Sequence, residues 1–394
     1  MTMVIRNARL MTCDPERPGL GMIDRGAVVM EGARIVWVGP DNEAPAGEAT
    51  VINADGRLVT PGLVDCHTHA IFAGDRAGEF AMRAAGKGYL EIAEAGGGIN
   101  ATLGPTRGAG HAKLLGILMT RLERMRDGGT TSVEVKSGYD LTTEGELALL
   151  RTVKTVAALE SPRVVPTLLA HLVPPERKAD RDVFVREICE QWIPRAAAEQ
   201  LATSVDVWCD TGAFTVDETR AIIGAAKAAA FGVRGHVGQL GDVGAAELMA
   251  EAGALSVDHV ELISDAAIAA LARAGTVAVM LPGACVQLRL PVPPVEKLRR
   301  AGVAMAVATD LNPGTSYCET LPIQMWLATT HYGMTVEEAW LGVTRVAARA
   351  LRVEAGALVA GARADCVIWS CERPEEVPYR YGTNLVSRVI CGGA

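Results

Sequence analysis

The stretch PGLVDCHTH at residues 61–69 decides how this chain is interpreted. An apolar pair, Leu63 and Val64, leads into two histidines, His67 and His69, that stand two residues apart. Residues two apart on a strand point to the same side, so a strand here would aim both imidazoles at one point. Neutral imidazoles in that arrangement are typical ligands of a first-row divalent metal. The alternative is a pair of surface histidines near a turn, but the chain has only seven histidines in all, which favours a metal site.

Length and composition limit what can surround this stretch. The chain has 394 residues, 49% of them hydrophobic, which suits a barrel-sized domain of about 250 residues and a smaller unit. The net charge of −8 argues against a nucleic-acid partner, which would require a basic surface. The motifs GxxxxGK[ST], GxGxxG and GxSxG are absent, so nucleotide binding and serine hydrolysis lack their usual signatures.

We expect neither a signal peptide nor a membrane span. No uncharged stretch reaches the roughly 20 apolar residues of a membrane span. The first residues lack the basic and apolar regions of a signal peptide. Nine cysteines without a Cys-x-x-Cys pair are expected to be thiols of a reducing compartment. We therefore expect a soluble, cytoplasmic protein without a membrane partner.

Beyond residue 62, short apolar runs alternate with amphipathic segments of helical period. The runs predict eight strands, at residues 63–66, 131–136, 164–170, 205–209, 233–236, 255–259, 277–281 and 303–309. Helices are expected at 112–125, 217–230, 245–252 and 265–274, among other segments. Such an alternation predicts an α/β fold with a (β/α)8 TIM barrel, which we place at residues 61–352.

Both ends of the chain are rich in strands instead. Residues 1–60 hold apolar runs at 3–10, 27–30 and 35–38, the last two joined by a hairpin signal. Residues 353–394 hold runs at 366–369 and 386–391. Within the barrel, the segment 86–110 contains eight glycines, and we expect a long loop over the C-terminal face. That loop is either a lid or an ordinary surface loop.

Active residues of a TIM barrel lie at the C-terminal ends of its strands. The fifth predicted strand ends at His236, the sixth at His259, and Asp310 follows the eighth. With His67 and His69, they give three imidazoles and one carboxylate for a metal, with His259 nearby. Any one of these histidines alone would more often be structural. Four of them at strand ends of one barrel favour a metal site that lowers the pKa of a water.

The His-x-His at the first strand resembles the start of the amidohydrolase superfamily barrel. Five further segments resemble the imidazolonepropionase family within it: VKSGY at 135–139, AHLVPPE at 170–176, HVGQ at 236–239, SVDH at 256–259 and ATDLNPGTS at 308–316. The resemblance extends over residues 58–345. It implies a small β-sandwich built from residues 1–60 and 353–394, and a homodimer.

The resemblance also implies an activity and the residues that carry it. Members of this family hydrolyse the cyclic amide of 4-imidazolone-5-propanoate to N-formimidoyl-L-glutamate in histidine degradation. By position, one zinc or iron ion is held by His67, His69, His236 and Asp310. The implied substrate contacts are Arg76, Tyr139, His171, Gln239, Asn312, Gly314 and Thr315. An arginine suits the carboxylate of this substrate because a guanidinium is a planar donor fork.

The expected mechanism is attack of water on the ring carbonyl carbon. His259 and Asp310 are expected to handle the protons, and His171 to stabilise the oxyanion. Many amidohydrolases hold a second metal through a lysine or glutamate at the end of the fourth strand. Here that position reads VWCD at 207–210, and Lys136 ends the second strand instead, so we expect one metal.

Other features leave alternatives open. The family pattern is broken at Asp140, at Val237-Gly238 and at Leu311, which bears on the choice of substrate. A deaminase of a cyclic amidine, such as guanine or cytosine, would use His-x-x-Glu. Gln239 stands at that place, and an amide cannot shuttle a proton. The remaining alternative is an inactive barrel kept as a binding scaffold, against which the intact ligand set argues.

Overall fold

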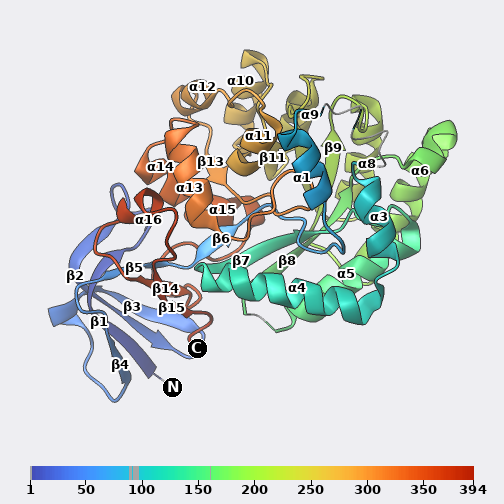
Figure 1. Ribbon diagram of the computed structural model, residues 1–394. Helices are drawn as coiled ribbons and strands as arrows, with labels where there is room; N and C mark the ends of the chain where they lie inside the picture. Colours follow the sequence, from blue (N-terminus) through green and yellow to red (C-terminus); the bar gives the residue numbers. More distant parts are fainter. Residues whose placement is uncertain (1, 88–90, 92–96, 160) are drawn as a thin grey trace.

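The computed structural model describes residues 2–87, 91, 97–159 and 161–394. Eight parallel strands follow one another around a barrel in chain order. They are β6 (Leu63–Asp65), β7 (Thr130–Lys136), β8 (Arg163–Ala170), β9 (Ser204–Cys209), β10 (Gly232–Val237), β11 (Ser256–His259), β12 (Val277–Met280) and β13 (Met305–Val307). Each coincides with a predicted strand, so the predicted TIM barrel is confirmed (Figure 1). Every residue of β7, β11 and β12 is buried, as expected of parallel strands covered by helices.

Helices surround the barrel (Figure 1). They are α1 (Ala77–Ala84), α3 (Asn100–Arg107), α4 (Gly110–Asp127), α5 (Thr143–Ala157), α6 (Arg181–Glu187), α7 (Ile193–Ala198), α8 (Val216–Ala228), α9 (Ala245–Glu251), α10 (Asp265–Ala274), α11 (Pro282–Leu288), α12 (Val295–Arg300), α13 (Leu321–Thr330), α14 (Val336–Gly342), α15 (Arg345–Leu351) and the short α16 (Glu376–Tyr379). Local signals fix their ends: Thr215 and Glu218 form a capping box at α8, and α10 ends at Gly275 with φ +70°. None of these helices combines the length and apolar character needed to cross a membrane.

The barrel closes at the C-terminal ends of β6 and β13. The backbone N–H of Asp310 donates to His67 O at 3.0 Å. The carboxylate of Asp65 accepts from the backbone and the hydroxyl of Thr309 at 3.1 and 2.6 Å. The first and last strands are thus joined where the predicted metal ligands begin, so barrel closure also fixes the positions of those ligands.

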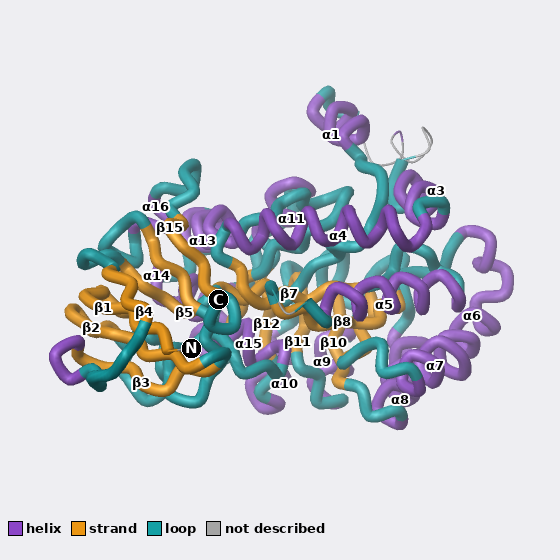
Figure 2. The backbone as a smooth tube through the Cα atoms, turned by 90° about the horizontal axis from the view of Figure 1, so that it is seen from below, coloured by secondary structure: helices purple, strands orange, loops and turns teal. Residues whose placement is uncertain are grey.

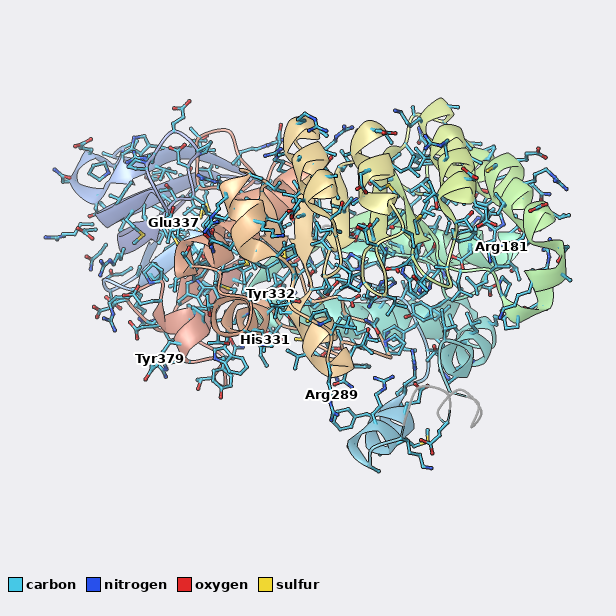
Figure 3. All side chains as sticks on the ribbon, turned by 90° about the horizontal axis from the view of Figure 1, so that it is seen from above. Arg181, Arg289, His331, Tyr332, Glu337 and Tyr379 are labelled. Atoms are coloured by element: carbon cyan, nitrogen blue, oxygen red, sulfur yellow. The ribbon has the colours of Figure 1, made fainter. Side chains whose placement is uncertain are left out.

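The glycine-rich segment 86–110 differs from the loop we expected. Helix α3 lies in its second half and α4 begins at Gly110, whereas residues 88–90 and 92–96 lie outside the described part. The hydroxyl of Thr106 in α3 accepts from Ala73 N at 3.0 Å, which holds the helix against the chain that leaves β6. Glycine weakens the helical signal of a sequence, and this hid α3. Helix α1 stands clear of the barrel in two views (Figures 2 and 3). A lid function of this segment stays a prediction.

The two chain ends build a second, seven-stranded sheet. Its strands are β1 (Thr2–Met11), β2 (Met22–Glu31), β3 (Arg34–Pro40), β4 (Thr50–Asn53), β5 (Leu58–Pro61), β14 (Cys366–Trp369) and β15 (Val386–Ile390), in the order β15-β14-β5-β1-β2-β3, with β4 also on β1. The predicted union of both ends is confirmed, and both termini lie beside this sheet (Figure 1). The division at residues 60 and 352 stays a prediction.

This sheet folds back on itself. Ile35 in β3 accepts a hydrogen bond from Gly361 N at 2.8 Å and donates to Ala362 O at 2.9 Å, just before β14. The strand β3 stands at one end of the strand order, and these two hydrogen bonds join it to the segment just before β14, near the other end. Buried side chains from both ends of the chain, such as Val28 and Ile368, fill one apolar cluster inside. This arrangement gives the small β unit a core of its own, as expected of a sandwich.

Candidate active site

Five side chains meet at the C-terminal end of the barrel. His67 and His69 follow β6, His236 lies in β10, His259 ends β11 and Asp310 follows β13. Asp310 Oδ1 lies 3.4 Å from His67 Nε2 and 3.5 Å from His69 Nε2. His69 Nε2 lies 3.3 Å from His236 Nε2, and the rings of His67 and His259 are 6.0 Å apart. All five side chains are buried, so the structure brings the predicted set together.

Two carboxylates orient two of these histidines. Nδ1 of His67 lies 2.7 Å from Asp258 Oδ2, and Nδ1 of His236 lies 2.9 Å from Asp206 Oδ1. Each Nδ1 therefore donates its proton, and each Nε2 presents a lone pair to the site. Burial, followed by the positive charge of Lys136, holds the pKa of His67 well below its usual value. The neutral imidazole, which is the form that binds metals, is thus favoured.

The donor atoms fit a divalent metal. His67, His69 and Asp310 form one group whose ligand atoms all lie within 4.8 Å of one another, and His67, His236 and His259 form another. Among the described residues, neither His67 Nε2 nor His69 Nδ1 has a hydrogen-bond partner. Converging acceptors repel one another unless a cation lies among them. Imidazole nitrogens with one carboxylate oxygen form a usual donor set for zinc and suit iron as well.

Lys136 lies beneath the histidines and is not a bridging ligand. Its Nζ is 2.7 Å from Glu134 Oε2, 2.6 Å from Asp206 Oδ2 and 3.7 Å from Asp258 Oδ2. Burial alone would lower the pKa of Lys136, but the carboxylates, with Asp206 foremost, raise it overall. The ammonium group therefore stays charged and balances the carboxylates that orient the histidines.

An aromatic side chain stands near the end of β9. At the end of β9, where a bridging residue would stand, the ring of Trp208 lies 5.6 Å from that of His171. An indole supplies no ligand to a metal. A further group of possible ligands consists of His67, Asp206 and Asp258. Lys136 already balances the negative charge of these two carboxylates.

His259 and Asp310 have strained backbones. Their φ values are +83° and +50°, in the left-handed region that residues with a Cβ normally avoid. Such strain costs about 1–3 kcal/mol and is concentrated at functional sites. Glu261 is buried beside His259, with its Oε2 3.7 Å from Nδ1. Burial would lower the pKa of His259, but the carboxylate of Glu261 raises it overall.

An aromatic wall stands beside His69. His171, which follows β8, stacks on His69 with ring centroids 5.6 Å apart, and its ring lies 5.7 Å from Tyr139. Nδ1 of His171 lies 2.9 Å from Gly138 O, so this nitrogen carries the proton. Burial lowers the pKa of His171 to about 4. A neutral His171 in this tautomer offers an acceptor at Nε2, which suits a ring N–H of a substrate better than an oxyanion.

A buried carboxylate shapes the loop that carries Tyr139. Glu146 accepts hydrogen bonds from the backbone N–H groups of Gly138, Asp140 and Leu141 at 2.6, 2.8 and 2.7 Å. The side chain of Asp140 accepts from Thr142 Oγ1 at 2.5 Å, at the start of α5. The departure from the family pattern at Asp140 therefore serves the helix start rather than the metal site.

The loop after β10 depends on a glycine and an aspartate. Gly238 has φ +65°, and a Cβ on it would lie 2.7 Å from Leu262 O, so only glycine fits. Asp210, after β9, accepts from Gln239 N at 2.7 Å and from Leu240 N at 3.1 Å. The Val237-Gly238 departure is thus a requirement of this turn, which leaves Gln239 buried at the site.

The loop after β13 is organised by Asn312. Its Oδ1 accepts from Gly314 N at 2.8 Å and from Thr315 N at 2.7 Å, and its Nδ2 donates to Asp310 O at 2.7 Å. The side-chain amide is therefore used within the loop, which positions Gly314 and Thr315. Leu311 is fully buried in an apolar cluster, which accounts for the departure there.

Arg76 is held at the start of α1 rather than exposed on an open surface. Its Nε and Nη2 donate to the two carboxylate oxygens of Glu79 at 2.8 and 2.7 Å. Gly314 packs on the guanidinium, since a Cβ there would lie 1.9 Å from Nη1. Burial raises the pKa of Tyr139, and the charge of Arg76 opposes that rise. Because Gly314 belongs to the loop that follows Asp310, Arg76 lies against that loop.

Comparison with known proteins assigns the family. Residues 58–393 match the model of the Amidohydrolase family. The chain belongs to the amidohydrolase family. It is 48% identical to the imidazolonepropionase of Acidiphilium cryptum, over 98% of each chain, and 47% identical to that of Caulobacter vibrioides, over 98% of each. The imidazolonepropionase of Paracoccus denitrificans is 44% identical over 99% of each chain. The predicted resemblance to imidazolonepropionases is confirmed.

Solved amidohydrolase-like structures share the fold at much lower identity. A triazine hydrolase variant superposes with a TM-score of 0.77 at 17% identity, covering 100% of this chain and 94% of that one. An adenosine deaminase from Xanthomonas campestris with bound Zn gives 0.73 at 17% identity, covering 99% of this chain and 92% of that one. At such identities, the comparison supports the fold alone.

Sequence reasoning missed the charged residues under this amidohydrolase site. Glu134, Asp206 and Asp258 each occupy a buried strand position, as do Lys136 and Arg234. A signal was present, because a charge inside an apolar strand is costly unless it is paired. One of these residues, Arg234, precedes a predicted site residue, His236, at strand spacing. Glu146, Glu79 and Glu261 lie outside the strands and gave no comparable signal.

Proposed function

We propose that this protein hydrolyses the cyclic amide of 4-imidazolone-5-propanoate to N-formimidoyl-L-glutamate, a step of histidine degradation, with one zinc or iron ion. The observation that carries the proposal is a guanidinium, that of Arg76, packed on Gly314 beside a set of buried metal-binding groups. A metal site next to a carboxylate receptor suits a substrate that joins a ring amide to a propionate. Full-length identity to imidazolonepropionases supports the same assignment.

His67, His69, His236 and Asp310 would hold the metal. When bound, the ion would polarise the ring carbonyl and lower the pKa of a water. The carboxylates Asp206 and Asp258 keep the imidazoles of His236 and His67 oriented toward it.

His259 is proposed as the base that takes a proton from the attacking water. It is buried next to the ligand set, and Glu261 beside its Nδ1 favours the protonated ring that results. Burial raises the pKa of Asp310 to about 6, so this carboxyl group is a second candidate for proton transfer. Cleavage of the ring C–N bond then requires a proton on the leaving nitrogen.

The other side chains are proposed to bind and orient the substrate. Arg76 takes the propionate carboxylate, and Nε2 of His171 accepts from a ring N–H. Tyr139, whose ring lies 6.0 Å from that of His69, and the buried Gln239 offer further polar groups. Deamination is not favoured, because Gln239 stands where a deaminase needs a carboxylate to shuttle protons. An inactive scaffold is not favoured either, because the ligand set is complete.

The proposal is tested by assaying the purified protein on freshly generated imidazolonepropionate, with guanine and cytosine alongside. We expect formation of N-formimidoylglutamate from the first compound, and no ammonia from the other two. Release of ammonia from guanine or cytosine, with imidazolonepropionate left intact, would establish the deaminase instead.

A second prediction concerns the metal. Elemental analysis should give about one equivalent of zinc or iron per chain, because the ligand atoms converge at a single point. Chelation should abolish the activity, and either ion should restore it. Two tightly held equivalents, both required for turnover, would contradict the single site.

We also propose a cytoplasmic location and a homodimer. All nine cysteines are unpaired, and seven of them are buried, which suits a reducing compartment. The homodimer rests on the resemblance to the family, and light scattering of the purified protein would test it.

A further inference from the structure

Glu79 sits between two arginines at the entrance to the site. Its carboxylate accepts from Arg76 Nε and Nη2 at 2.8 and 2.7 Å, and its Oε2 lies 3.5 Å from Nη2 of Arg83. Glu79 is buried although it lies in the first turn of α1. Neither Glu79 nor Arg83 belongs to the set of substrate contacts described above.

The pairing with Glu79 leaves part of Arg76 available. A guanidinium has five N–H donors. Glu79 takes one from Nε and one from Nη2, so both donors of Nη1 and the second donor of Nη2 remain. Those donors form the planar end of the guanidinium, which matches a carboxylate. Gly314 lies directly against Nη1, and a side chain at this position would occupy the space of the guanidinium.

Arg83 supplies a charge that the pair of Arg76 and Glu79 lacks. One carboxylate and one guanidinium together have no net charge and would attract a second carboxylate weakly. Arg83 makes the net charge of the cluster +1, and its Nη1 also donates to Gly314 O at 3.3 Å. Both guanidiniums are therefore held against the loop that follows Asp310.

Position in the fold explains why Arg76 needs a partner. Helix α1 projects from the barrel (Figures 2 and 3). Among the described contacts at its start, Asp75 Oδ1 accepts from Ala77 N at 3.0 Å, and Glu79 Oε1 accepts from Gly98 N at 2.8 Å. Glu79 thus connects the start of α1 to the chain that returns toward α3.

We infer that Arg76, Glu79 and Arg83 form one receptor for the carboxylate of the substrate. Glu79 is a positioning residue that turns the free end of Arg76 toward the site, and Arg83 provides the unbalanced positive charge. The inference rests on the proposed function and adds two residues that determine which substrates are accepted. The receptor binds ring compounds that carry a carboxylate at the propionate position more tightly than the same rings without that carboxylate.

The test compares two stable probes on the metal-loaded protein: imidazole-4-propionate, which lacks the hydrolysable carbonyl, and 4-methylimidazole, which also lacks the carboxylate. Calorimetry on Glu79→Gln should show the dissociation constant of the propionate probe raised about tenfold, near 1.4 kcal/mol, with that of 4-methylimidazole unchanged. Arg83→Met should act in the same direction. Arg76→Met should raise the dissociation constant of the propionate probe by about 10–100-fold, the effect of losing a charge-assisted hydrogen bond. For imidazolonepropionate, Glu79→Gln should raise KM rather than lower kcat.

Glu296→Gln is the matched control, because it breaks an i,i+3 pair with Arg299 on the outer helix α12. It should change neither dissociation constant. Equal weakening of both probes by Glu79→Gln would make Glu79 a structural residue, and tighter binding of the propionate probe would make it a competitor of the substrate; either result overturns the inference. Failure of the wild type to hydrolyse imidazolonepropionate, while it still prefers the propionate probe, would reject the proposed function and leave the receptor standing.

Discussion

Replacing His259 with alanine should lower kcat by about 10²–10⁴-fold, the range of a lost general acid–base group. The ring is buried next to the ligand set, and Glu261 lies 3.7 Å from its Nδ1. Metal content should stay near that of the wild type, because His67, His69, His236 and Asp310 are unchanged. Steady-state kinetics and elemental analysis of the same preparation measure both quantities.

The control for this experiment is His331→Ala, since His331 is an exposed histidine that follows α13 (Figure 3). It should leave kcat and metal content unchanged. Loss of metal from His259→Ala would make His259 a ligand, and a near-normal kcat would remove it from the mechanism. Glu261→Gln should give a smaller loss than His259→Ala, because it removes the orienting carboxylate but leaves the base in place.

The barrel could be predicted from the sequence because its strands are short, buried and separated by helices of regular period. The ligand set followed from the same pattern. His67 and His69 stand two residues apart just after a strand, and His236 and His259 each stand at or near the end of a predicted strand. In a parallel barrel, those ends lie on one face, so positions along the chain translate into positions in space.

The charged layer beneath the site could not be predicted in the same way. Lys136 in β7 pairs with Asp206 in β9, and Asp258 in β11 pairs with His67 after β6. These contacts cross the interior of the barrel between strands that are not neighbours in the sheet. Which side chains meet there depends on strand tilt and stagger, and a single sequence carries no information on either.

The local backbone conformation of site residues was the other feature that the sequence did not predict. His259, the last residue of β11, and Asp310, which follows β13, have positive φ values. Histidine and aspartate are more frequent in this region than other residues with a Cβ, but they adopt it too rarely for the sequence to predict it. Likewise, the contacts of α3 with residue 73 outweigh the low helical propensity of its glycine, so the helix forms where a loop was expected.

The ion pairs of Lys136 beneath the site predict a large effect of its substitution on stability. Replacing Lys136 with methionine should lower the free energy of unfolding of the metal-free protein by about 3–5 kcal/mol, the cost of removing one partner of a buried ion pair. The substitution removes the lysine from two buried carboxylates: Asp206 loses its cation, whereas Glu134 keeps Arg234, whose Nη1 lies 3.5 Å from its Oε1. The affinity for the metal should also fall by about 10–100-fold, because Asp206 orients His236. Urea denaturation of the metal-free protein and metal titration measure the two effects.

The control is Lys154→Met, at an exposed lysine that donates to the backbone carbonyl of Glu199. Its free energy of unfolding should stay within about 0.5 kcal/mol of that of the wild type.

The loss caused by Lys136→Met should depend on pH in a defined direction. Burial alone would raise the pKa of Asp206, but His236 and Lys136 hold it well below its usual value. An aspartate whose pKa is lowered by folding stabilises the folded protein at pH values above the ordinary aspartate pKa, about 3.9. That stabilisation is lost as the pH falls through the pKa of the folded state. Without Lys136, the unpaired carboxylate has a raised pKa and is least destabilising when protonated. The difference between wild type and variant should therefore be largest near neutral pH and shrink in acid. A difference that is constant from pH 7 to pH 4 would mean that the variant loses packing rather than charge balance, and that Lys136 does not hold the carboxylates ionised.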